Sequence, residues 1–147
     1  MRRKLQDVLE QESPTLWRMT DARRKALPEF YAQCIADADV QVLVAEDPES
    51  DTHRVVGTAV GRLGTGRDVA RYGSIDDVWV EPEYRGYGIC RALLVQLTEF
   101  FQAHGVKKLT VGFAYGGTAA GLWQRLGFTP AVVTANADVD LVKARNT

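Results

Sequence analysis

Residues 85–91, RGYGICR, combine two arginines with two closely spaced glycines between a strand-forming run and an amphipathic run. The first backbone N–H groups of a helix have no partner inside the helix, and they carry the positive end of its dipole. Gly86 and Gly88 let the backbone approach a ligand closely, and Arg85 and Arg91 add fixed positive charge. The segment therefore predicts a site for a phosphate or pyrophosphate at the start of a helix.

Two common phosphate fingerprints do not fit this segment. A dinucleotide-binding loop requires a third glycine where Arg91 stands, and a P-loop requires Gly-Lys followed by Ser or Thr. A nucleotide-binding α/β domain therefore stays a weaker hypothesis. A tight turn without any ligand also accounts for the two glycines when they are taken alone, so the flanking sequence has to decide between these interpretations.

Asp76 and Asp77 are two adjacent carboxylates inside an otherwise apolar run. Side chains alternate along a strand, so we expect the two to point to opposite faces of a sheet. A carboxylate beside a reaction centre can accept a proton from a nucleophile. The structural alternative for either residue is a buried carboxylate held by backbone N–H groups or by an arginine.

The elements that position these residues are predicted from hydrophobic periodicity and turn residues. Residues 41–46 and 54–63 are rich in strand formers and flank a polar turn, which predicts an antiparallel hairpin. A third strand over residues 72–80 should end before Pro82. Two helices are expected first, over residues 4–12 and 21–38, and the second should bury the face formed by Ala26, Phe30, Cys34 and Ala38.

The best-defined helix is predicted over residues 87–104, directly after the glycine-containing loop. Residues 107–113 form the next strand, and this strand-helix-strand crossover makes two strands parallel. A shorter helix is expected over residues 118–126. The tail should hold extended pieces over residues 128–134 and 139–143.

Length and composition limit the function classes. The 147 residues predict one domain over 1–147, and 46% hydrophobic with 25% charged residues is typical of a soluble globular protein. The sequence has no apolar run of membrane-spanning length and no secretory signal, so we expect a cytoplasmic protein without membrane contact. Its basic residues are scattered, which argues against nucleic acid. No metal-ligand spacing, disulfide pattern or triad is indicated for Cys34, Cys90, His53 or His104.

A resemblance to a known family rests on six consecutive residues. They are Arg85, Gly86, Tyr87, Gly88, Ile89 and Cys90, and they resemble the RxxGxG/A acyl-CoA motif of the GNAT superfamily of N-acetyltransferases. The preceding IDDVWVEP is similar to the family's central strand, and AAGLWQRLGF is similar to its second motif. The resemblance covers residues 75–128, roughly a third of the chain.

The resemblance implies an α/β fold with a mixed, mostly antiparallel central sheet, flanked by helices, in which one parallel strand pair splays apart. The strand ending at Val80 would separate from its parallel neighbour. The pantetheine arm of acetyl-CoA, or of another acyl-CoA, would then hydrogen-bond to backbone near Val78 and Val80. Backbone N–H groups from Tyr87 through Arg91 would hold the pyrophosphate. The resemblance implies no metal.

For function, the resemblance implies an N-acyltransferase, with acetyl as the expected acyl group, that acts by direct transfer in a ternary complex. The acceptor would be a primary amine on a small molecule or a peptide. Asp76 stands where similar proteins carry an acidic residue proposed as general base, and Asp77 is the second candidate. The alternative is a regulatory module of the same fold that binds acyl-CoA without turnover.

Three positions depart from the family pattern. Trp123 stands where many members have a tyrosine that protonates the leaving thiolate. An indole N–H is not a usable acid near neutral pH, so Trp123 is expected to contact the pantetheine or the core. Tyr115, Tyr87, water or the free thiolate itself would then meet that need. Gly116 replaces a common asparagine, and Cys90 replaces glycine or alanine, which leaves open a reactive thiol with a lowered pKa.

Family members usually open with a strand, and none is evident before residue 4. The strand is missing, or residues 16–19 supply a short version, or the chain begins late relative to its relatives. An exposed sheet edge would pair with another subunit, so a homodimer is a further expectation. The acceptor pocket would be built from the opening helices, residues 64–71 and the tail, which carry no signature of a particular amine.

Overall fold

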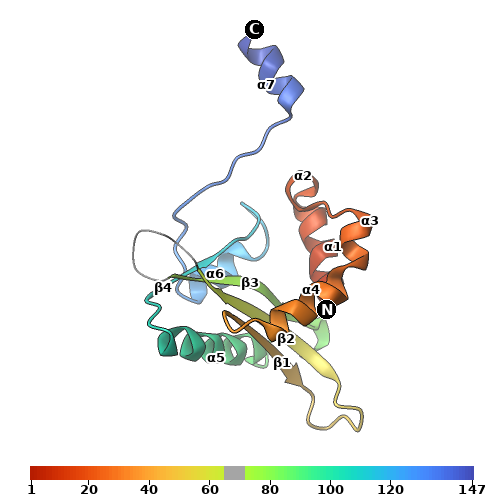
Figure 1. The fold of residues 1–147 in the computed structure, drawn as a ribbon, viewed down its shortest axis with the longest axis vertical. Coiled ribbons are helices and arrows are strands. Elements are labelled where there is room, and N and C mark those ends of the chain that lie inside the picture. The colour runs from red at the N-terminus through yellow and green to blue at the C-terminus, as the bar shows by residue number, and fades with distance from the viewer. Residues whose placement is uncertain (65–71) are drawn as a thin grey trace.

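The structure is a computed structural model that describes residues 1–64 and 72–147, apart from the side chains of residues 15 and 16. A four-stranded sheet in the order β1-β2-β3-β4 forms its centre (Figure 1). The strands are β1 Val40–Glu46, β2 Val55–Leu63, β3 Tyr72–Val80 and β4 Lys108–Val111. β2 pairs antiparallel with β1 and β3, whereas β3 and β4 are parallel. The mixed, mostly antiparallel sheet predicted from the sequence is confirmed.

The parallel pair separates along its length. β4 pairs with β3 only from Tyr72 to Ile75, where Ile75 lies opposite Val111. β3 then continues to Val80 and pairs there with β2 on its other side. The edge of β3 beyond Ile75 is therefore open towards the β4 side, which confirms the predicted splay.

Helix α5 (Ile89–Ala103) covers one face of the sheet (Figure 1). Its apolar residues recur at helical spacing, and Leu93, Leu97 and Phe101 are buried in one cluster with Ala59 and Ile75 of the sheet. The short helix α6 (Ala120–Arg125) follows β4 and adds a buried tryptophan to the same cluster. This cluster is the main core, and it fixes the start of α5 beside the end of β3.

Phe101 lies over two glycines of neighbouring strands. A Cβ atom built on Gly61 would lie 2.8 Å from Cζ of the Phe101 ring, and one built on Gly73 would lie 2.6 Å from its Cδ1. Both distances are well below van der Waals contact. Glycine at these two positions therefore lets α5 pack closely on β2 and β3, with only 1% of Phe101 exposed.

The N-terminal helices cover the opposite face (Figure 1). Helix α1 (Arg2–Glu12) contacts β3, and helix α4 (Leu27–Ala36) contacts β1. Cys34 of α4 is buried in a second cluster with Val40 and Val60. Lys4 of α1 places its Nζ 2.8 Å from Oε2 of Glu81, a buried residue just after β3. These contacts hold the helical layer over the middle and end of β3.

The prediction of a single helix over residues 21–38 is wrong, because the structure has two helices there. Helix α3 (Asp21–Lys25) ends at Ala26, where α4 begins. Pro28 lies in the first turn of α4 and has no N–H to donate to the carbonyl of Arg24. A continuous helix would leave that carbonyl without its partner, so the chain starts a new helix instead.

The buried face of α4 also differs from the predicted one. Leu27 and Cys34 are buried and Tyr31 is half-buried, whereas Phe30 is 48% exposed. Spacings of four and then three residues follow the 3.6-residue turn more closely than a constant spacing of four. Of the predicted face, Cys34 alone is buried, because Ala26 and Ala38 are exposed as well.

Both ends of the chain differ from expectation in part. Helix α2 (Pro14–Trp17) occupies the segment in which a short strand was considered, and in residues 1–39 the structure describes no strand. Residues 128–138 form neither helix nor strand, and α7 (Val139–Asn146) is a helix that lies apart from the sheet (Figure 1). The extended piece predicted over residues 139–143 is therefore wrong, and residues 128–134 form no strand. A strand needs a neighbouring strand for its backbone groups, whereas a helix bonds its own.

Candidate functional site

The loop between β3 and α5 has the geometry of an anion site. A short 3₁₀ turn (Pro82–Tyr84) follows β3, and then Gly86 and Gly88 adopt φ values of 85° and 84°. The left-handed conformation at both positions favours glycine, and a Cβ atom on either would meet no atom within 4 Å. The space beside both glycines is therefore open.

Several successive N–H groups of this loop have no acceptor among residues 1–64 and 72–147. Gly88 is the N-cap residue of α5 and supplies no side-chain cap. Within the described part of the chain, the first N–H of this helix with a partner is that of Ala92, which donates to the Gly88 carbonyl at 3.0 Å. The N–H groups from Gly86 to Arg91 thus form a row of donors at the positive end of a helix of 15 residues.

The two arginines of the loop have different roles. Arg85 donates from Nε to the Val80 carbonyl at 2.9 Å, and its guanidinium carbon lies 4.9 Å from the centre of the Trp79 ring. Arg85 therefore connects the loop to the end of β3 through a hydrogen bond and a cation–π contact. Arg91 is exposed on the first turn of α5, where it adds positive charge beside the row of N–H groups.

A cavity of about 610 Å³ begins at Arg91 and runs between α5, α6 and the β3–β4 pair. Arg91 and Arg125 carry its positive charge. Its apolar lining includes Ile75, Leu94, Leu109, Leu126 and Phe128. An apolar wall with cationic side chains suits a long ligand that has an extended arm and a phosphorylated end.

Other predicted donor-site residues lie around this cavity and do not all line it. Val78 and Ile89 pack against the main core. Trp123 is 7% exposed and packs edge-on against Phe128, with ring centres 5.3 Å apart. Trp123 is thus a core residue by its contacts. Tyr87 is 81% exposed.

Tyr115 and Cys90 are two further side chains for which the sequence suggests a chemical role. Tyr115, considered as an alternative proton donor, is 88% exposed. Cys90 is half-buried, and burial raises the pKa of its thiol. The direction is opposite to that of an activated thiol, so the idea of a reactive Cys90 with a lowered pKa is wrong.

A β-bulge in β3 places Asp76 and Asp77 on the same side of the sheet. Asp77 pairs with Val60 of β2, and the next partner pair is Ile75 with Gly61, so Asp76 is an extra residue without a partner. Ile75 and Val78 both pack on the α5 side, which leaves the two residues between them on the other. The prediction that the two carboxylates point to opposite faces is therefore wrong.

Asp77 is held from the helical layer. Its carboxylate accepts a hydrogen bond from the Tyr31 hydroxyl, and Oδ1 lies 3.1 Å from Nε of Arg2. The Asp77 side chain is 11% exposed, and this burial raises the pKa of its carboxyl. Burial and the neighbouring Asp77 likewise raise the pKa of Tyr31, so its hydroxyl stays a donor.

Asp76 is held from the sheet itself. Oδ2 lies 3.0 Å from Nε of Arg62, and Oδ1 accepts from the Ser74 hydroxyl at 2.7 Å. The Asp76 side chain is 32% exposed, so solvent or a substrate can reach it. Arg62 lies opposite Ser74 in the register of β2 and β3, which explains why it meets Asp76.

Both aspartates line a second cavity of about 390 Å³ under the N-terminal helices. The cavity is also lined by Arg2, Met19, Arg23, Ala26, Leu27, Phe30, Val60 and Arg62. It lies on the face of the sheet opposite α5, whereas the loop of residues 85–91 leads into α5 on the other face. Residues of the opening helices, which are expected in an acceptor pocket, line this cavity, whereas residues 65–71 of the predicted loop lie outside the described residues.

Sequence reasoning missed the residues that hold the two aspartates. It also missed the contact between α1 and the loop before α6. Arg2, Tyr31 and Arg62 lie far from β3 in sequence or on another strand. Glu12 at the end of α1 accepts from both N–H and hydroxyl of Thr118, at 3.0 and 2.7 Å, on the loop before α6. The pairing of β2 with β3 could have given a signal, because its register places Arg62 opposite Ser74 and near Asp76.

Two negative findings concern the part of the chain that the structure describes. No cluster of three or more His, Cys, Asp or Glu side chains there has a metal-binding arrangement. None of its helices is both long and apolar enough to span a membrane.

Known proteins share this arrangement of elements. One solved structure, a tetramutant of a Bacillus halodurans protein, superposes with a TM-score of 0.79 at 17% identity, covering 94% of this chain and 89% of that one. A predicted acetyltransferase of Clostridium acetobutylicum, solved with acetyl-CoA, gives 0.70 at 18% identity over 95% and 86% of the two chains. The aminoglycoside 6'-N-acetyltransferase of Acinetobacter haemolyticus gives 0.62 at 22% identity over 95% and 96%. The sequence also matches the model of the acetyltransferase (GNAT) family over residues 3–128. This chain therefore belongs to the GNAT family of acetyltransferases.

Proposed function

We propose that the protein transfers an acetyl group from acetyl-CoA to a primary amine while both substrates are bound. The observation that carries the proposal is the position of the donor loop. Free N–H groups from Gly86 to Arg91 lie beside a strand pair that separates after Ile75, and two carboxylates lie across the sheet. A donor and an acceptor can thus approach one opening from opposite sides.

The residues present fit acetyl-CoA. The row of N–H groups and Arg91 would hold its pyrophosphate, and the apolar cavity between α5 and α6 offers room for the rest. The open edge of β3 at Val78 and Val80 would hold the pantetheine arm through backbone hydrogen bonds. Acetyl-CoA supplies an activated thioester when it is bound.

Asp76 is our candidate for the general base. An ammonium group has to lose a proton before its nitrogen can attack, and a carboxylate oxygen can accept that proton directly or through water. Asp76 is the more exposed of the two aspartates, 32% against 11% for Asp77, so the amine can reach it. Asp77, the weaker candidate, instead pairs with Arg2 in the wall of the same cavity and accepts a hydrogen bond from Tyr31.

A non-catalytic acyl-CoA-binding module remains the second candidate, and Trp123 is the observation that favours it. Trp123 lies in the core, and Tyr115 and Tyr87 are 88% and 81% exposed. Under the leading proposal the sulfur leaves as a thiolate or takes a proton from water. Turnover therefore has to be measured separately from binding.

The test combines thermal shift with thiol release. A ligand at about 100 times its Kd stabilises the folded state by about 2.7 kcal/mol, so acetyl-CoA and CoA should raise the Tm and ATP should not. Arg91→Gln should weaken both CoA ligands, whereas Lys107→Gln, an exposed cation away from the loop, should not. Thiol release with an amine panel then separates the enzyme from the module. Absence of any shift by CoA ligands at millimolar concentration would overturn both candidates.

A further inference from the structure

The cavity under the N-terminal helices has an excess of positive charge. Three arginines and two aspartates line it, which leaves one positive charge in excess. Both aspartates are already paired, Asp77 with Arg2 at 3.1 Å and Asp76 with Arg62 at 3.0 Å. The remaining arginine, Arg23, therefore has no carboxylate partner in the lining of this cavity.

Two guanidinium groups there have unused donors. Arg23 is exposed at the cavity, and its side chain forms no ion pair or hydrogen bond with any residue in 1–64 or 72–147. Nη1 of Arg2 is buried and has no acceptor within those same ranges. A buried cationic donor without a partner is unfavourable, and an incoming anion would satisfy it. Both arginines line the same cavity and have donors left that suit a carboxylate or a phosphate group.

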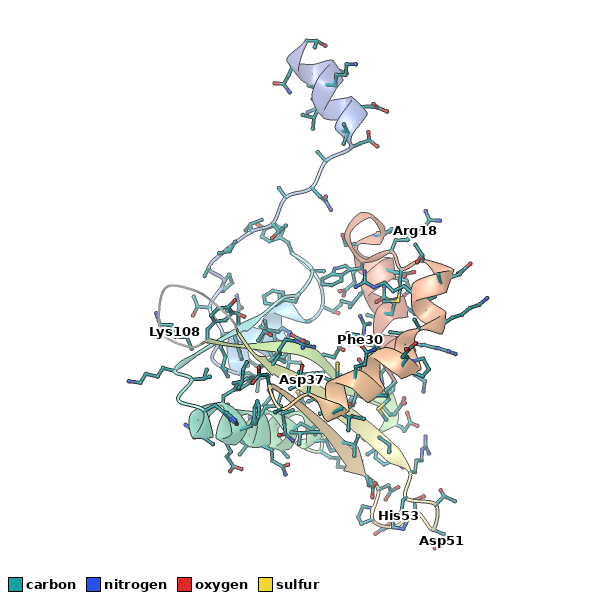
Figure 2. All side chains as sticks on the ribbon, in the orientation of Figure 1. Arg18, Phe30, Asp37, Asp51, His53 and Lys108 are labelled. Atoms are coloured by element: carbon teal, nitrogen blue, oxygen red, sulfur yellow. The ribbon has the colours of Figure 1, made fainter. Side chains whose placement is uncertain are left out.

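The rest of the lining is largely apolar. Met19, Ala26, Leu27 and Phe30 supply an apolar wall. Phe30 belongs to α4 in the helical layer (Figure 2). Polyamines and aminoglycosides carry several positive charges, and a cavity with a net positive lining disfavours them. An amine that also carries a negative group meets complementary charges at both ends.

We infer that the acceptor is a primary amine that bears a carboxylate or a phosphate group, with the anion on Arg23 and Arg2 and the amine at Asp76. The inference rests on the proposed function, because it identifies this cavity as the acceptor site. Amino acids and phosphorylated amino sugars share the required chemistry. The experiment has one arm for each.

Each arm compares an anionic amine with a neutral or purely cationic analogue in thiol-release kinetics with acetyl-CoA. The first pair is phenylalanine and phenylalaninamide, and the second is glucosamine 6-phosphate and glucosamine, with spermidine as a polycation. The anionic member of at least one pair should have a kcat/KM at least tenfold higher than its analogue. Higher kcat/KM for the analogues or for spermidine would overturn the inference and leave the acetyltransferase proposal intact.

Variants of Arg23 test the assignment of the anion site. Arg23→Gln should raise KM for the anionic amine about tenfold and change kcat and the neutral amine little, and Arg23→Glu should reverse the preference. Arg18→Gln is the matched control, because Arg18 is an exposed cation of the same helical layer outside the cavity (Figure 2). Equal losses for all amines in Arg23→Gln would count against an anion site.

Direct binding distinguishes this inference from the proposed function if no amine is acetylated. Isothermal titration of the CoA complex with phenylalanine and glucosamine 6-phosphate gives the readout. Binding of an anionic amine, lost in Arg23→Gln and kept in Arg18→Gln, would support the anion site although turnover has failed. Absence of binding by every anionic amine would overturn the inference.

Discussion

Asp76 and Asp77 are consecutive in the chain, and their carboxylates nevertheless line the same cavity, because Asp76 is the extra residue of a β-bulge. The bulge lies directly beyond the last pairing of β3 with β4, at Ile75. The same point of β3 therefore brings both carboxylates to one face and begins the opening between the strands. Asp76 and Asp77 nevertheless differ in their partners and in their exposure. Substitution of each residue can therefore separate their roles.

Asp76→Asn should lower kcat by about 10²- to 10⁴-fold if Asp76 is the general base, since that is the usual contribution of proton transfer. The affinity for acetyl-CoA should stay the same, because the donor loop lies across the sheet from this side chain. Steady-state kinetics and a CoA thermal shift measure the two quantities. Unchanged turnover in this variant would remove Asp76 from the proposed role.

Asp77→Asn should change how stability depends on pH. Burial raises the folded-state pKa of Asp77 above its unfolded value of about 3.9, so its contribution to stability is full below that value and is lost as the pH rises through the folded pKa. The free energy of unfolding of the wild type should therefore fall relative to Asp77→Asn as the pH rises from about 4 to 7. Urea titrations at several pH values give the difference. A wild type that gains relative stability over this range would contradict the prediction.

Lys4→Met should show the opposite sign through Glu81. The hydrogen bond from Lys4 holds the pKa of Glu81 below its ordinary value. The stabilisation is then present above the unfolded pKa of about 4.3 and is lost as the pH falls. The loss of Tm in Lys4→Met should be largest near neutral pH and shrink towards pH 3, whereas Arg3→Met, an exposed neighbour, should have little effect at any pH. A pH-independent loss would mean that the charge of Glu81 is not involved.

Glu12→Ala should weaken the contact between α1 and the loop before α6. Glu12 satisfies two donors of Thr118, and its removal should lower the free energy of unfolding by about 1–2 kcal/mol. Because α1 also lines the proposed acceptor cavity through Arg2, KM for the amine should rise more than KM for acetyl-CoA. Gln11→Ala, at the exposed neighbouring position, is the control. The idea fails if both variants behave alike in chemical denaturation and kinetics.

The glycine-containing turn before α5 could be predicted from the sequence because its parts are neighbours in the chain. Gly86, Gly88 and the start of α5 lie within a few residues, so local patterns describe them. The aspartate cavity could not be predicted in the same way. A bulge is a property of two paired strands, and Arg2 and Tyr31 reach Asp77 only through tertiary packing. Alternation along a single strand therefore gave the wrong faces.

The helix errors have a more local cause. Pro28 is visible in the sequence and disfavours a helix that continues from Arg24, so the break at Ala26 was within reach of sequence reasoning. The tail is a different case. Its β-branched residues favour extended structure, but strand formation depends on a neighbouring strand, which local composition does not reveal.

Phe101 and the glycines beneath it restrict how this sequence can change over time. A methyl group at Gly61 or Gly73 would collide with the ring, whereas a smaller side chain at position 101 would make room for it. Substitutions at these positions are therefore non-additive, and a change on a strand becomes acceptable only after a change on the helix. Among homologues, glycine at the two strand positions should accordingly co-vary with an aromatic residue on the helix.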